Sequence, residues 1–139
     1  MADIHFFFPY KKHILSDRNK LKSFIETLFK KEKTKLGSLQ YIFCSDEFLL
    51  DINRQYLKHD YFTDIITFDL GDKETVGEIY ISIDRVKDNA ASFKTSFKRE
   101  LHRVIFHGAL HLCGYKDKLN EEKKIMRAKE DRYLQEYFK

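Results

Sequence analysis

Two histidines placed one helical turn apart are the most specific chemical feature of this 139-residue sequence. His107 and His111 occur in the stretch FHGALHLCGYKDK, and on a helix their imidazoles project from one face. Gly114 follows where a helix would end, so the chain can fold back and bring Asp117 to the same face. Two histidines and one carboxylate, with a position left for water, form the ligand set of a catalytic zinc site. We therefore expect His107, His111 and Asp117 to hold one divalent metal ion, with Zn²⁺ as the first candidate.

Other interpretations of these residues stay open. A histidine pair at this spacing also occurs on apolar helices that bind no metal, and the glycine turn and nearby carboxylate are what favour a site here. His102 would lie roughly 140° around the helix from His107, so we do not expect it to join the pair. A metalloprotease is disfavoured, because the general base of its HExxH motif would fall at Gly108. The residues indicate a metal-dependent hydrolase that lacks the protease base.

The elements that must position these residues follow from hydrophobic periodicity. Strands are expected at 4–8, 39–44, 63–70 and 76–83, with the last two joined as a hairpin. Helices are expected from Ser16 or Asp17 to a break at Gly37, from Ser45 onward, and over 84–93, 97–113 and 120–137. The helix after Ser45 is expected to bury four side chains: Phe48, Leu49, Ile52 and Tyr56. The order βαβαββααα predicts an α+β fold, a single layered domain over residues 1–139 whose mixed sheet is packed by helices.

Composition excludes several classes of protein. No run of about 18 apolar residues is present, and the N-terminus lacks the apolar core of a signal peptide, so we expect neither a membrane span nor secretion. Two cysteines cannot form a disulfide framework, which favours a cytoplasmic location. The net charge of +4 divides into +5 for residues 1–44, −6 for 45–93 and +5 for 94–139. The basic ends could bind a polyanion, or they could simply be solvated helix faces.

Three blocks of sequence resemble the bacterial YbeY family of metal-dependent endoribonucleases. HGALHLCGYKDK resembles the signature H-G-x-L-H-L-x-G-Y-D-H. Asn53 to Phe68 is similar to N-x-x-Y-R-x-x-D-x-x-T-D-V-L-S-F, and Gly77 to Ser82 is similar to G-D-I-x-I-S. The resemblance implies a small α+β fold, one bound metal ion that is usually zinc, and a cleft for single-stranded RNA. It also implies a role in the maturation of small-subunit ribosomal RNA at its 3′ end and in ribosome quality control, with the ribosomal subunit as a partner.

The sequence departs from the family pattern at several positions, among them Lys116, which replaces the aspartate before the third ligand. Asp117 stands where the signature has a third histidine, and a carboxylate ligand makes other divalent metals more competitive with zinc. Leu57 replaces an arginine, and if that arginine contacts phosphate in the family, Arg54 or Lys58 would have to substitute for it. Arg103 stands where many relatives carry a histidine. It is a candidate phosphate contact, although a surface ion pair with Glu100 would also explain it.

Two functions are favoured by this pattern, and hydrolysis of a different phosphoester or an amide is a weaker third. The first is a single-strand-specific, metal-dependent endoribonuclease with His107, His111 and Asp117 as ligands and an unassigned general base. The second is a non-catalytic, ribosome-associated RNA-binding factor in which the metal stabilises the turn at Gly114. An open coordination position would favour the first, and a fourth protein ligand would favour the second.

Overall fold

A computed structural model describes residues 2–139. Its elements, in chain order, are β1 (Asp3–Phe7), α1 (Arg18–Lys31), β2 (Leu36–Cys44), α2 (Asp46–Leu57), β3 (Ile65–Asp69), β4 (Thr75–Ser82), α3 (Ile83–Ser92), α4 (Phe97–Leu112) and α5 (Asn120–Tyr137). The predicted order of elements and the α+β class are therefore confirmed. Among residues 2–139, no helix combines the length and apolar character that crossing a membrane requires.

The four strands form one mixed sheet with the order β1-β2-β4-β3. β1 and β4 both pair with β2 in parallel, and β3 pairs antiparallel with β4 as the predicted hairpin. β3 is consequently an edge strand, with one side left free of sheet partners among the described residues. β3 also packs against α4, the helix that carries the histidine pair.

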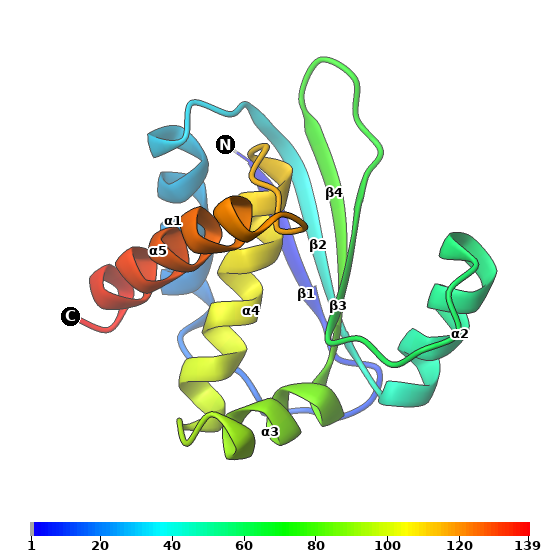
Figure 1. Cartoon of the computed structure of the whole chain (residues 1–139). Coiled ribbons are helices and arrows are strands. Elements are labelled where there is room, and N and C mark those ends of the chain that lie inside the picture. Colours follow the sequence, from blue (N-terminus) through cyan, green and yellow to red (C-terminus); the bar gives the residue numbers. More distant parts are fainter. Residues whose placement is uncertain (1) are drawn as a thin grey trace.

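Helices cover the two faces of the sheet unequally (Figure 1). α1, α4 and α5 lie on one face and build the main core, where alternate strand residues such as Tyr41, Phe43 and Ile79 are fully buried. α2 lies on the opposite face and packs through a smaller cluster that contains Leu49, Ile52 and Ile66. The main core therefore holds α4 against the sheet and fixes where its polar face points.

Close packing between α4 and the sheet depends on Gly108. A Cβ atom at this position would lie 2.9 Å from Cδ1 of Ile79 and 3.0 Å from Cδ1 of Ile65. Position 108 thus faces the sheet, between the two histidines in sequence but turned away from their side of the helix. A protease-type glutamate has no room there, which gives a structural reason for the missing HExxH base.

Two local predictions were wrong, and a third was right only in the position where the helix starts. α1 ends at Lys31, not at Gly37, because Lys33 adopts a left-handed backbone (φ 56°) that turns the chain, and Gly37 lies within β2. Asp17 occupies the N-cap position of α1, but its side chain makes no capping hydrogen bond. Phe48 and Tyr56 are 48% and 67% exposed, because α2 contacts the sheet only through the stripe that contains Leu49 and Ile52.

Candidate metal centre and cleft

The end of α4 and the turn that follows bring the three predicted ligands together. Gly114 has φ +100°, a left-handed conformation suited to glycine, and its N–H donates to the carbonyl of His111 over 3.0 Å. After this turn, Oδ2 of Asp117 lies 3.1 Å from Nε2 of His107 and 3.3 Å from Nε2 of His111. Ligand atoms of a tetrahedral site with bonds near 2.1 Å lie about 3.4 Å apart. The spacing and the donor types of the three residues fit a small divalent ion.

Each histidine is oriented by a second contact on its other ring nitrogen. Nδ1 of His107 lies 2.6 Å from Oε2 of Glu130, a residue of α5 that is only 4% exposed. Nδ1 of His111 lies 2.9 Å from the carbonyl oxygen of Tyr115. Both acceptors require a proton on Nδ1, which leaves Nε2 of each ring free to act as a ligand. The rings are therefore held in the tautomer that metal binding needs.

The buried carboxylate of Glu130 also affects the protonation of His107. Burial by itself would lower the pKa of His107, but the hydrogen bond and negative charge of Glu130 outweigh it, so the pKa lies above the usual value. Glu130 thus stabilises positive charge on the imidazole, whether a proton or a metal ion supplies that charge. Oε1 of the same carboxylate accepts from Arg103 over 3.1 Å, which fixes Glu130 from its other side.

The loop that carries Asp117 is anchored to α1 through Glu32. The Tyr115 hydroxyl donates to Oε1 of Glu32 over 2.6 Å, and Oε2 accepts from the Tyr133 hydroxyl and from Lys129. Burial acts to raise the pKa of Glu32, but these three donors lower it below its ordinary value. Glu32 is therefore ionised, and its carboxylate holds Tyr115, whose carbonyl orients His111.

The three candidate ligands line a cleft of about 800 Å³ between α4, the free side of β3 and the loop that joins α2 to β3. Five carboxylates and three cationic side chains line it, which leaves it two charges negative when its histidines are neutral. One bound divalent cation would bring that formal charge to zero. Without a bound cation the negative cleft would repel a polyanion such as RNA, whereas a bound divalent cation would remove this repulsion.

Asp64 is the carboxylate of the cleft that lies at the start of β3. Burial raises the pKa of its side chain, and the positive charge of His107 only partly offsets this effect. Its main-chain carbonyl accepts from the N–H of Ser82 over 2.9 Å, so its position is tied to the start of α3. Sequence reasoning did not single out this residue among the many acidic residues of the central segment.

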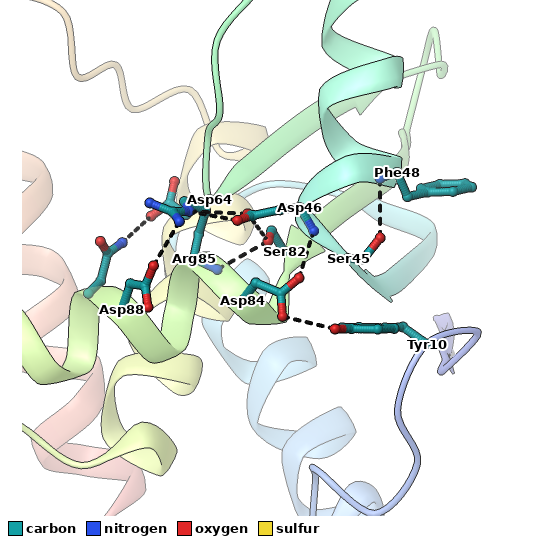
Figure 2. Close-up of polar contacts among 10 residues, drawn as sticks. Tyr10, Ser45, Asp46, Phe48, Asp64, Ser82, Asp84, Arg85 and Asp88 are labelled. Carbon is teal, nitrogen blue, oxygen red and sulfur yellow. Dashed lines mark hydrogen bonds and ion pairs between the residues drawn. The ribbon is translucent and has the colours of Figure 1, made fainter.

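A polar cluster beside Asp64 joins the N-termini of α2 and α3 (Figure 2). Ser82, the N-cap of α3, donates to Oδ1 of Asp46 over 2.6 Å, and Asp46 also accepts from Nε of Arg85. In return, Asp84 of α3 accepts from the main-chain N–H of Asp46 over 2.9 Å. Asp84 thus caps the start of α2, and Asp46 holds the hydroxyl of Ser82, whose oxygen caps α3 by accepting from the N–H of Arg85. These contacts fix both ends of the segment that carries the cleft loop and β3.

The three predicted RNA contacts occupy different environments. Arg103 lines the cleft, but its guanidinium is 2.9 Å from Asp131 and 3.1 Å from Glu130, so its charge is already compensated. Its predicted alternative partner, Glu100, lies 3.7 Å away. Arg54 pairs with Asp60 at 2.5 Å, and neither it nor Lys58 is among the residues that line the cleft. The other two cations of the cleft are Lys118 and Arg127, which the sequence did not suggest.

Comparison with known proteins identifies the family. A family model described as Endoribonuclease YbeY matches residues 10–138. The chain belongs to the YbeY family. A relative in Cytophaga hutchinsonii, named Endoribonuclease YbeY, is 53% identical over 133 residues, which cover 94% of this chain and 93% of the relative. A second YbeY relative with the same name, in Flavobacterium psychrophilum, is 51% identical over 114 residues, 81% of each chain.

The YbeY fold assignment also has support from a solved structure. A solution structure of a Thermotoga maritima protein superposes with a TM-score of 0.64 and 30% sequence identity, covering 99% of this chain and 89% of that one. Together with the sequence matches, this confirms the resemblance drawn from the three sequence blocks. The chain that carries the candidate metal centre also matches the relative in Cytophaga hutchinsonii over most of that relative's length.

Proposed function

We propose that this protein is a single-strand-specific, metal-dependent endoribonuclease. The observation that carries the proposal is the convergence of two Nε2 atoms and one carboxylate oxygen in a cleft, in a chain whose relatives are named endoribonucleases. His107, His111 and Asp117 would hold one divalent ion, with Zn²⁺ favoured by the two imidazole ligands. The carboxylate of Asp117 would let harder ions compete for the same site.

A bound ion would supply positive charge to the scissile phosphate and lower the pKa of water next to it. Glu130 and the carbonyl of Tyr115 would keep the imidazoles of His107 and His111 aimed at the ion. Lys118 and Arg127 would attract neighbouring phosphates of the RNA strand, in a manner weakened by salt. Asp64, with its raised pKa and its place in the cleft, would accept the proton that water loses when it attacks.

We further propose that the substrate is small-subunit ribosomal RNA, cut during the late maturation of its 3′ end and in ribosome quality control. The support is family membership, together with the cleft of about 800 Å³ that contains the candidate metal ligands. A ribosomal subunit would present this RNA in the cytoplasm. Cleavage of protein-free RNA and of RNA within the subunit would distinguish recognition of the strand from recognition of the particle.

The decisive experiment compares His111→Ala with His5→Ala, an exposed histidine outside the cleft. Bound metal would be measured in protein purified without added metal, and cleavage would be followed on a labelled single-stranded RNA. We expect His111→Ala to lose both metal and cleavage while His5→Ala keeps both. Cleavage by metal-free protein would overturn the mechanism. A wild-type protein that binds metal and RNA but cuts no RNA would instead be the non-catalytic ribosome-associated factor.

A further inference from the structure

We propose that His59 and Tyr61 form a stacking platform for an unpaired base of the RNA strand, an inference that rests on the proposed function. Both residues lie in the loop between α2 and β3 (Figure 1), and both line the cleft that contains the candidate metal ligands. Tyr61 is 55% exposed although it belongs to the cleft wall. Nothing in the metal-centred chemistry described above uses either side chain.

The two rings are held together as one unit. Their centroids lie 5.2 Å apart with an interplanar angle of 21°, which is a stacked arrangement. The Tyr61 hydroxyl and Nδ1 of His59 are 2.8 Å apart, so a hydrogen bond joins the rings as well. A pair fixed in this way loses little side-chain entropy when a further ring adds to the stack.

The backbone beneath this pair is anchored by a buried polar side chain. Asn53 is 1% exposed, and its amide nitrogen donates to the carbonyl of Tyr61 over 2.9 Å. The main-chain carbonyl of Asn53 in turn accepts from the N–H of His59 over 3.1 Å. The rigid loop therefore presents the aromatic pair at a fixed place in the cleft wall, instead of leaving it on a free segment.

An unpaired nucleobase is the ligand that suits such a platform. Every base has a π-face, so stacking on an aromatic ring binds single-stranded nucleic acid with little sequence preference. A base-paired strand has no free face to offer, which would give this cleft its preference for single strands. Phe93, 57% exposed at the end of α3, lines the same cleft and offers a second apolar surface to a neighbouring nucleotide.

The test compares two nuclease-resistant oligonucleotides on the metal-loaded protein: a single-stranded phosphorothioate 2′-O-methyl RNA and the same backbone without bases. Binding to wild type, Tyr61→Ala and Tyr56→Ala would be measured by fluorescence anisotropy. Tyr56 is a matched control, because it is 67% exposed on α2 and lies outside the cleft lining. The backbone without bases keeps the phosphate charge, so the comparison isolates the contribution of the bases.

We expect wild type and Tyr56→Ala to bind the base-bearing strand more tightly than the backbone alone. Tyr61→Ala should lose about 5- to 100-fold of affinity for the base-bearing strand and little for the backbone. Equal affinity of wild type for the two oligonucleotides, or an unchanged preference in Tyr61→Ala, would overturn the platform. If the protein still cuts RNA in a metal-dependent way, such a result would contradict only the stacking platform and not the proposed function. The two proposals can therefore be tested independently.

A spectroscopic variant gives a second readout. The sequence contains no tryptophan, so Tyr61→Trp adds a single fluorophore at the platform and Tyr56→Trp adds one outside the cleft. The base-bearing strand should quench the emission of Trp at position 61 and leave that at position 56 unchanged. Equal responses at the two positions would contradict stacking at Tyr61.

Discussion

His107 and Glu130 face each other across the contact between α4 and α5, with Nδ1 and Oε2 separated by 2.6 Å. The carboxylate is almost fully buried, so the contact is shielded from water and from competition by salt. This contact defines the tautomer of one candidate ligand and makes α5 part of the candidate metal centre, although none of the three candidate ligands belongs to that helix.

Replacing Glu130 with glutamine should weaken metal binding about 10- to 100-fold, because loss of an outer carboxylate leaves the imidazole less basic and less well oriented. Competition titration with a chelator of known affinity measures the effect directly. Glu121→Gln, on the same helix at an exposed position, should bind metal like the wild type. An unchanged affinity in Glu130→Gln would show that the contact serves packing alone.

Changing Asp117 to histidine should shift metal preference toward zinc and away from manganese. The change replaces a hard oxygen ligand with a softer nitrogen and restores the third histidine of the family signature. The ratio of the dissociation constants for Zn²⁺ and Mn²⁺, measured on both proteins, tests this. The same ratio in both would mean that Asp117 does not contact the ion.

Asp64→Asn should lower the cleavage rate by roughly 10²- to 10⁴-fold, the usual contribution of a general base, without changing the metal content. The control is Asp69→Asn, which alters the carboxylate at the end of β3; it lines the same cleft, and the variant should retain most activity. The pH–rate profile adds an independent check. Because burial raises the pKa of Asp64, wild-type activity should fall with decreasing pH at a higher pH than an ordinary aspartate would give. A full rate in Asp64→Asn would exclude the proposed proton acceptor.

His102 should make the fold sensitive to mild acid. Burial lowers its pKa below the ordinary value of 6.5, and among residues 2–139 its Nε2 is the buried side-chain nitrogen that has no hydrogen-bond partner. A lowered pKa means that the unfolded chain binds the proton more tightly. Stability is therefore fully present above pH 6.5 and falls as the pH decreases toward the folded pKa, by at most about 1.4 kcal/mol per pH unit.

The variant His102→Phe keeps a ring against Tyr137 and Phe138 but removes the titrating group. Urea unfolding at pH 7.5 and pH 5.5 should show a smaller loss of stability for this variant than for the wild type. Identical losses in the two proteins would mean that His102 is not the group responsible.

The convergence of the three candidate ligands could be predicted from the sequence because its geometry is local. Helical spacing places His107 beside His111, and a single glycine turn returns Asp117, so no knowledge of distant segments was needed. The residues that orient the triad could not be found in this way. Glu130 lies 23 residues from His107, and Glu32 lies 83 residues before Tyr115, so only the packing of α1 and α5 on α4 brings them together.

The errors in the helix predictions have a similar origin. Lys33 adopts the left-handed conformation usually left to glycine, and no rule of local propensity identifies that position. On α2, Phe48 and Tyr56 have the spacing of a buried stripe, yet the face of the sheet opposite the main core is covered only in part, so both remain exposed. Periodicity identifies which residues share a face, but tertiary structure decides whether that face is covered.

The anchoring of the Asp117 loop by Glu32 has a consequence for how the protein acquires activity. Its contacts to Tyr115 and Tyr133 join segments separated by 83 and 101 residues, so they form only when distant parts of the chain have closed on one another. A chain in which α5 is undocked would keep the carbonyl of Tyr115 beside His111, but it would lack Glu130 beside His107 and the contact of Tyr133 to Glu32. Under the proposed function, tight metal binding would therefore require that α5 has docked, and molecules in which it has not docked would cleave RNA poorly.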